Sequence, residues 1–214
     1  MQDGDLFSQT DPCIEIAPDV YLLKQFVAAD AAAILKAIDS VFQQAPPRQM
    51  QTPGGYMMSA RISNCGPLGW ATDRQGYRYT AQDPLTDKPW PAMPELFRAL
   101  ASEAARLAGF EDFQPDACLI NEYLPGARMG MHQDKDEQDF SQPIVSFSLG
   151  LPVTFQFGGV KRSDPKQHIM LAHGDVIVWG RQKRLNYHGV LPLKNGEHPL
   201  TGARRINLTF RRAC

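Results

Sequence analysis

The sequence predicts an α+β fold in which helices come first and a β sandwich or jelly roll follows. Apolar residues recur at helical spacing in two early segments, residues 31–44 and 94–107. From residue 117 onward, short β-prone runs alternate with Gly, Pro and Asp, and no helical pattern intervenes. Because strands without crossover helices pack as two sheets, these runs indicate a sandwich or jelly roll.

The N-terminal region predicts one strand and one helix. Residues 21–27 are apolar and β-prone, and Asp30 is a suitable N-cap for a helix over residues 31–44. The double proline at 46–47 ends that helix. Its single apolar face leads us to expect that it packs on a sheet.

The segment from residue 48 to residue 94 is rich in Gly, Pro, Tyr and Trp. This composition favours short strands and long loops over a packed hairpin. A second amphipathic helix is predicted over residues 94–107, with Gly109 as its C-cap.

The C-terminal half contains the β core. Its predicted strands lie in residues 117–124, 144–151, 153–159, 168–180, 187–193 and 204–211. A chain of 214 residues is long enough to bury one real core, so we expect a single domain.

The composition excludes several classes of protein. With 22 basic and 23 acidic residues, the chain is not a polycationic nucleic-acid binder, and any nucleic acid must be held by a local patch. The four Cys are widely spaced without a CxxC pair, which favours reduced thiols over a disulfide scaffold. The acidic N-terminus resembles no signal peptide and no run of about 20 apolar residues follows, so we expect a cytoplasmic protein that does not enter a membrane.

A His-x-Asp pair is the first candidate for chemistry. His132 and Asp134 point to the same side of an extended chain, and two His with one carboxylate bind Fe(II) in non-haem oxygenases. His188 is the candidate for the second His. The segment 173–175, His-Gly-Asp, has the same spacing, but it leads directly into an apolar run, which favours a hairpin turn.

The C-terminal strand alternates between polar and apolar side chains. Arg205, Asn207 and Arg211 share one face, and burying two guanidiniums there would require an anion such as a dicarboxylate. The alternative is an edge strand with its Arg face in solvent. Asn121 and Tyr123 also share one face of a predicted strand and could bind the same ligand, although Tyr123 could equally be a core residue.

Aromatic and basic residues interleave within residues 61–79, a pattern that single-stranded or flipped bases would suit. A solvated loop with packed aromatics is the alternative interpretation. The residues concerned are Arg61, Trp70, Arg74, Tyr77, Arg78 and Tyr79, to which later loops add Lys135, Lys161, Arg162 and Lys166.

Several blocks of the chain, in order, closely resemble the AlkB family of Fe(II)- and 2-oxoglutarate-dependent DNA-repair dioxygenases. They include RQMQTPGGYMMS, NCGPLGW, KPWPAMP, FQPDACLINEY, HQDKDE, FQFGG, YHG and RINLTFR, and they cover residues 48–212. The resemblance implies one domain over 1–214: an N-terminal extension and first helix (1–45), a nucleotide-recognition lid (48–94) and a double-stranded β-helix, or jelly-roll, catalytic core (115–212).

The resemblance also assigns roles to individual residues. The implied metal ligands are His132, Asp134 and His188, and the implied 2-oxoglutarate contacts are Asn121, Tyr123, Arg205, Asn207 and Arg211. The implied substrate residues are Trp70, Tyr77, Lys135, Asp136 and Arg162. Within these sets, Arg205 would hold the distal carboxylate of 2-oxoglutarate. Trp70 and His132 would enclose a flipped base, and Asp136 would lie near its exocyclic amine.

The implied reaction is oxidative demethylation of N1-methyladenine and N3-methylcytosine with Fe(II), 2-oxoglutarate and O2, releasing formaldehyde, succinate and CO2. The expected partner is alkylated single-stranded DNA, with double-stranded DNA and RNA as further candidates, and the expected state is a monomer. Two alternatives stay open: a dioxygenase of the same fold acting on RNA or protein, and a non-catalytic nucleic-acid-binding jelly roll with a structural metal.

Overall fold

The computed structural model describes residues 13–214, so the first twelve residues of the predicted N-terminal extension lie outside the described residues. Its helices are α1 (Ala31–Gln44) and α2 (Glu95–Leu107), with one 3₁₀ turn, η1 (Arg181–Lys183). The first seven strands are β1 (Cys13–Ala17), β2 (Val20–Leu23), β3 (Arg61–Cys65), β4 (Gly69–Asp73), β5 (Gly76–Thr80), β6 (Ala117–Tyr123) and β7 (Met129–His132). The remaining strands are β8 (Ile144–Gly150), β9 (Val153–Phe157), β10 (Gln167–Leu171), β11 (Val176–Trp179), β12 (His188–Val190) and β13 (Arg205–Arg211).

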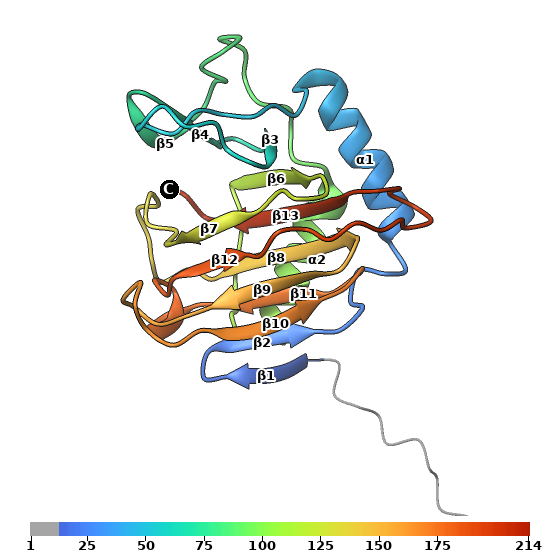
Figure 1. Ribbon diagram of the computed structural model, residues 1–214, viewed down its shortest axis with the longest axis vertical. Helices are drawn as coiled ribbons and strands as arrows, with labels where there is room; N and C mark the ends of the chain where they lie inside the picture. Colours follow the sequence, from blue (N-terminus) through green and yellow to red (C-terminus); the bar gives the residue numbers. More distant parts are fainter. Residues whose placement is uncertain (1–12) are drawn as a thin grey trace, which may run out of the picture.

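Two antiparallel sheets form the core (Figure 1). The larger sheet has the order β1-β2-β11-β8-β13-β6-β3, and the smaller sheet has the order β10-β9-β12-β7. From β6 to β13 the chain crosses between the two sheets at every step except from β9 to β10, as in a jelly roll. The predicted fold class is therefore confirmed.

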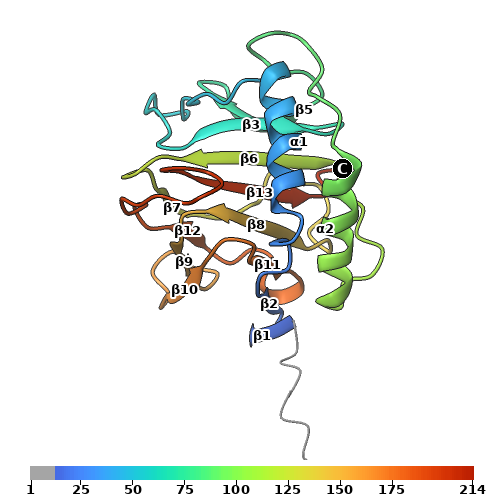
Figure 2. The ribbon, with the colours of Figure 1, turned by 90° about the vertical axis from the view of Figure 1, so that its right-hand side faces the viewer.

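Both helices cover the outer face of the larger sheet (Figure 2). The bounds of α1 match the prediction, although the side chain of Asp30 makes no capping hydrogen bond. Helix α2 begins one residue late because Pro94 is its N-cap, and Gly109 follows the C-cap with a φ of +77°. Neither helix is long and apolar enough to cross a membrane, and no other helix in residues 13–214 is either.

Strand β13 lies in the interior of the larger sheet. It pairs with β6 on one side and β8 on the other, so the edge-strand alternative is wrong. Ile206, Leu208 and Phe210 pack toward the helices. Because side chains alternate along a strand, Asn207 and Arg211 face the space between the sheets instead.

Three predicted strands differ from the structure by several residues. The run 187–193 is a strand only over β12, His188–Val190. The N-terminal strand ends at Leu23 instead of residue 27, because the chain turns there and Gln25 has a φ of +54°. Residues 168–180 form two strands, β10 and β11, which belong to different sheets. The turn at residues 173–175 is therefore a corner between sheets and not a hairpin, and its buried Asp175 accepts a hydrogen bond from Lys24 Nζ at 2.8 Å.

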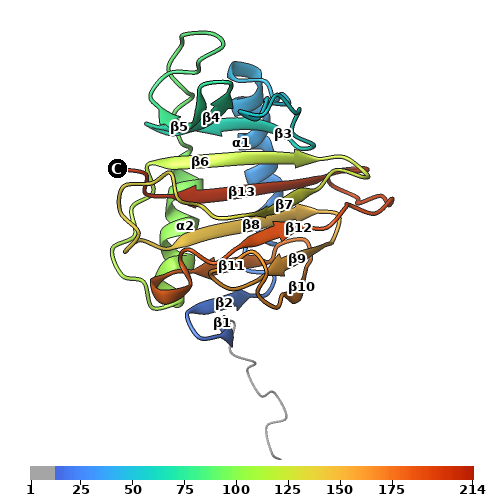
Figure 3. The same cartoon turned by 60° about the vertical axis from the view of Figure 1, so that its left-hand side comes forward.

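The segment 48–94 divides into two parts. Strand β3 is integral to the larger sheet through its pairing with β6. Strands β4 and β5 form a separate tight hairpin beyond β3, which corrects the expectation of loops without a packed hairpin (Figure 3). Gly76, with a φ of +120°, allows the turn between the two strands. We refer to residues 69–80 as the β4–β5 hairpin.

Candidate metal and co-substrate site

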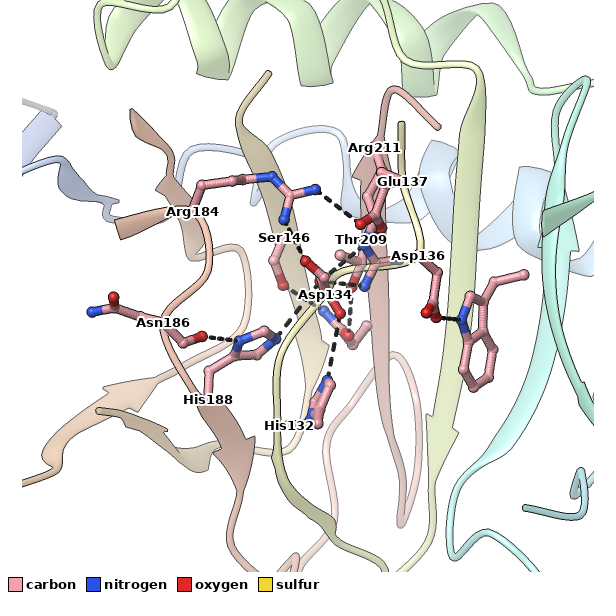
Figure 4. A network of polar contacts seen from close by, with 12 residues as sticks. His132, Asp134, Asp136, Glu137, Ser146, Arg184, Asn186, His188, Thr209 and Arg211 are labelled. Carbon is pink, nitrogen blue, oxygen red and sulfur yellow. Dashed lines mark hydrogen bonds and ion pairs between the residues drawn. The ribbon is translucent and has the colours of Figure 1, made fainter. Parts of the chain in front are cut away.

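Three side chains from two segments that are distant in the sequence meet between the sheets. His132 ends β7, and His188 begins β12 directly opposite it in the antiparallel register. The Nε2 atom of His132 lies 3.6 Å from Asp134 Oδ1, and that of His188 lies 3.7 Å from Asp134 Oδ2 (Figure 4). One donor atom from each residue falls within 4.8 Å of the others. The structure thus brings together the three residues predicted to bind metal.

The two imidazoles are held in the tautomer that a metal requires. His132 Nδ1 lies 2.9 Å from the carbonyl oxygen of Gly130, and His188 Nδ1 lies 3.1 Å from that of Asn186. Because a carbonyl oxygen can only accept, each Nδ1 carries the hydrogen, and the Nε2 lone pair is free to ligate.

The charges in this cluster also suit a divalent cation. Burial, followed by the proximity of His132, lowers the pKa of His188 to about 3, so this imidazole is neutral at pH 7. Burial alone would raise the pKa of Asp134, but Arg211 and the two His hold it well below its ordinary range. Two imidazole nitrogens and an ionised carboxylate are the donor set of a 2-His-1-carboxylate Fe(II) site, so the residues fit that metal.

A buried guanidinium without a full set of partners lies against Tyr123, which lines a small pocket together with His132 and His188. Arg205 is 1% exposed, and among the described residues its Nε and Nη1 have no hydrogen-bond acceptor. Its Nη2 donates to Ser148 Oγ at 3.0 Å, and the guanidinium stacks 5.2 Å from the ring of Tyr123. Since unsatisfied buried donors are costly, this arrangement fits a carboxylate of 2-oxoglutarate.

The other predicted co-substrate residues form the walls of a small pocket beside His188, which is lined by Asn121, Tyr123, Asn207 and Arg211. Asn207 already donates to Ser146 Oγ and to the backbone oxygen of Phe147, each at 2.8 Å. Arg211 is likewise engaged with Asp134. The roles of these four residues toward 2-oxoglutarate stay predictions.

A larger cavity of about 580 Å³ opens over the His132 side of the cluster. Trp70 stacks on Tyr77 with ring centroids 5.6 Å apart, and its Nε1 donates to Asp136 Oδ2 at 2.8 Å. The cavity walls include every residue predicted to bind substrate: Trp70, Tyr77, Lys135, Asp136 and Arg162. The structure therefore places all five around one space next to the candidate metal ligands.

A family model described as the 2OG-Fe(II) oxygenase superfamily matches residues 19–211. The alpha-ketoglutarate-dependent dioxygenase AlkB of Salmonella typhimurium is 57% identical over 211 residues, which cover 98% of each chain. The chain belongs to the AlkB family of 2OG-Fe(II) oxygenases. The solved structure of OsALKBH1 superposes with a TM-score of 0.82 at 28% identity, covering 94% of this chain and 100% of that one. The nucleic acid dioxygenase ALKBH1 of Homo sapiens is 32% identical over 133 residues, covering 61% of this chain and 34% of that protein.

Membership of the AlkB family decides between two of the alternatives. The chain is a dioxygenase that depends on Fe(II), 2-oxoglutarate and O2, which is the chemistry for which the His-Asp-His cluster and Arg205 are suited. The interpretation as a non-catalytic binding protein with a structural metal is therefore wrong.

The structure corrects the predicted basic surface of this AlkB-family chain. Arg61 is ion-paired with Glu122 at 2.7 Å, and Arg78 with Asp73 at 2.7 Å, so neither is an uncommitted cation. The cations that line the large cavity are Arg128, Lys135, Arg162 and Arg211. Arg128 was not singled out from the sequence, where it follows a Pro-Gly turn like many solvent-exposed arginines.

Two further residues near the metal cluster, Glu137 and Arg184, match no sequence pattern that marks a site. They are joined to each other and to Tyr79 by ion pairs and hydrogen bonds behind Asp134. Glu137 ends a charged run, which is typical of an exposed loop, and yet it is 6% exposed. Only the tertiary contacts distinguish it from its solvated neighbours.

The lowered pKa of His188 predicts a pH dependence of stability in the metal-free protein. Between pH 6.5 and 3, the unfolded chain binds a proton that the folded chain excludes, so the free energy of unfolding falls as the pH falls. We expect His188 to contribute up to about 1.4 kcal/mol per pH unit in this range. Urea denaturation with a chelator at several pH values measures this slope.

The matched variants for this measurement are His188→Gln and His168→Gln. His188→Gln should flatten the slope, whereas His168→Gln, at an exposed position on β10, should retain it. Identical slopes in all three proteins would contradict the explanation.

The unpaired donors of Arg205 predict a specific defect in co-substrate use. Arg205→Met should raise the KM for 2-oxoglutarate by about 10- to 100-fold, because a hydrogen-bonded charge contributes roughly 1.5–3 kcal/mol. Succinate production at varied 2-oxoglutarate concentration measures this change. Arg204→Met is the control, since the neighbouring Arg204 pairs with Glu122 at 2.8 Å; an equal rise in both variants would rule out Arg205 as the carboxylate anchor.

Proposed function

We propose that this dioxygenase repairs alkylated DNA by oxidative demethylation of N1-methyladenine and N3-methylcytosine. The observation that carries the proposal is the Trp70–Asp136 pair, which places an aromatic face and a carboxylate in one cavity beside the metal cluster. The proposal is supported by the resemblance to AlkB-family repair enzymes and by the description of human ALKBH1 as a nucleic acid dioxygenase.

The cavity has the size and walls that a flipped base requires. Its volume of about 580 Å³ lies within the usual range for small-molecule sites. Trp70, backed by Tyr77, offers one stacking surface, and the partly exposed ring of His132 lies on the cavity wall near the candidate metal position. A base held between them would direct its N-methyl group toward the metal cluster.

The charges of the cavity favour an alkylated base over an ordinary one. Both proposed lesions carry a positive charge, which the carboxylate of Asp136 would attract in a partly dry cavity. Methylation at these positions also blocks Watson–Crick pairing, so the damaged base costs less to extrude from the helix. Arg128, Lys135 and Arg162 at the cavity would contact phosphates, and so few contacts imply weak, salt-sensitive binding.

Different residues of the chain would bind the metal, the co-substrate and the base in the proposed reaction. His132, Asp134 and His188 would hold Fe(II), and Arg205 would hold a carboxylate of 2-oxoglutarate. With O2, this metal and co-substrate supply the oxidation of an N-methyl carbon, which leaves as formaldehyde while succinate and CO2 form. Trp70 orients the base, and the rings of Phe155 and Trp179, which pack against His188, exclude water from the far side of the cluster.

We also propose a lid, a preferred partner, an oligomeric state and a location for this protein. The β4–β5 hairpin would be the central part of a nucleotide-recognition lid spanning residues 48–94, over a catalytic core at 115–212, because Trp70 and Tyr77 reach the cavity from it. The preferred partner would be single-stranded DNA, since an unpaired strand presents its bases without the cost of opening a duplex. We further propose a monomer located in the cytoplasm.

The direct test is demethylation of a defined oligonucleotide. Purified protein with Fe(II), 2-oxoglutarate, ascorbate and single-stranded DNA containing N3-methylcytosine should release formaldehyde and lose the mass of one methyl group. The same lesion in RNA, and a methylated peptide, serve as competing substrates. Faster turnover of RNA or peptide would favour the alternative dioxygenase, and an unchanged DNA mass would refute the proposal.

The stacking role of Trp70 predicts a defect confined to the nucleic-acid substrate. Trp70→Ala should lower kcat/KM for the oligonucleotide by about 5- to 150-fold, corresponding to roughly 1–3 kcal/mol of stacking. Its KM for 2-oxoglutarate should not change. Leu85→Ala, at a 69% exposed position, is the control. Wild-type kcat/KM in Trp70→Ala would indicate that the ring serves packing alone.

A further inference from the structure

Glu137 is a buried carboxylate that no step described so far requires. It lies three residues after Asp134 and is 6% exposed. Its Oε1 accepts a hydrogen bond from Tyr79 Oη at 2.7 Å and lies 3.4 Å from Arg211 Nε. Its Oε2 lies 3.2 Å from Arg184 Nη2. These three partners come from β5, β13 and the residue after η1, so Glu137 joins three distant segments.

The two arginines that contact Glu137 also hold Asp134 (Figure 4). Arg211 donates from Nε at 2.9 Å and from Nη2 at 2.7 Å, both to Asp134 Oδ2. Arg184 donates from Nη1 to the backbone oxygen of Asp134 at 2.8 Å. One guanidinium therefore fixes the side chain of the candidate metal ligand, and the other fixes its main chain. Asp134 Oδ1 accepts no hydrogen bond from any described residue, which leaves it free for a metal.

Charge balance explains why this cluster includes a second carboxylate. Arg184 and Arg211 are both buried, and Asp134 alone would neutralise only one of them. Without the charge of Glu137, the uncompensated guanidiniums would be drawn toward Asp134, which is the nearest remaining carboxylate. They would then compete with a cation for its oxygen atoms.

The same carboxylate reaches the β4–β5 hairpin. Tyr79 lies directly opposite Trp70 in the hairpin register. Trp70 bonds to Asp136 at an exposed position, whereas the bond from Tyr79 to Glu137 is partly buried. Burial raises the pKa of Tyr79 well above 10, so its hydroxyl keeps its proton and donates to Glu137. Both acceptors are carboxylates, so the less exposed hydrogen bond, from Tyr79, is the stronger of these two attachments.

We propose that Glu137 is a positioning residue that keeps Asp134 oriented to bind metal and attaches the β4–β5 hairpin to the metal centre through Tyr79. The inference depends on the metal chemistry of the family and not on the identity of the substrate. Its tests therefore stand whether or not the enzyme demethylates DNA.

The first test measures metal affinity without turnover. Calorimetric titration of metal-free protein with Mn(II) should show a 10- to 100-fold higher Kd for Glu137→Gln, the usual loss when a residue that orients a metal ligand is removed. Glu137→Asp keeps the charge but withdraws it by one methylene, so its Kd should fall between those of the wild type and Glu137→Gln. This second variant carries the test if Glu137→Gln does not fold, which circular dichroism would show.

Glu122→Gln is the matched control for this titration. Glu122 is also a buried carboxylate that pairs with two arginines, Arg61 at 2.7 Å and Arg204 at 2.8 Å, but it contacts none of the candidate metal ligands. Its variant should bind Mn(II) within about twofold of the wild type. Equal weakening in Glu137→Gln and Glu122→Gln, or an unchanged Kd in both Glu137 variants, would overturn the positioning role.

The second test follows the hairpin by hydrogen–deuterium exchange. Peptides covering residues 69–80 should exchange faster in Tyr79→Phe and in Glu137→Gln than in the wild type or Glu122→Gln. Tyr79→Phe should leave the Mn(II) affinity within about twofold of the wild type, because it removes only the attachment of the hairpin. Wild-type exchange of these peptides in Tyr79→Phe would overturn the proposed link.

Discussion

The ion pair between Asp134 and Arg211 is the interaction on which the site depends. Arg211 is the last residue of β13, an interior strand of the larger sheet, whereas Asp134 lies in the loop after β7 of the smaller sheet. The pair therefore spans the two layers of the jelly roll where the candidate metal ligands meet. Both groups are buried, so each would be costly without the other, and their mutual attraction also keeps Asp134 ionised. The two packed sheets thus position the candidate metal ligands.

Polar and apolar side chains alternate along β13, so its two faces have different functions. Its apolar residues form the floor on which α1 and α2 pack, and its polar residues form one wall of the catalytic space. Because pairing with β6 and β8 sets the height of each residue, Arg205 lies opposite Tyr123 and Asn207 lies opposite Asn121. The positions of the side chains that face the candidate co-substrate pocket thus follow from the strand register and do not depend on a loop.

Whether a residue's place in the fold could be predicted depended on whether nearby or distant parts of the sequence determine it. Strand alternation is local, so the polar face of β13 could be predicted from the sequence, as could both helices. The grouping of His132, Asp134 and His188 followed from a spacing pattern, which the resemblance to a family made specific. Glu137 could not be found, because its burial depends on Tyr79, Arg184 and Arg211 from distant segments. The partner of Arg61 was hidden for the same reason, since Glu122 reaches it only through the pairing of β3 with β6.

Because His132 pairs directly with His188, the candidate metal site forms only when β7 and β12 pair in the native register. Strand β12 has only three residues, and the Cβ of any side chain at Gly189 would lie 2.8 Å from the backbone oxygen of Met129. A slip of one residue between β7 and β12 would turn one imidazole to the opposite face of the sheet and separate the ligands. A cation bound at this site would favour the register of β7 and β12 in which both imidazoles point toward it. A bound metal would thus stabilise the native register of β7 and β12 in addition to its part in the reaction.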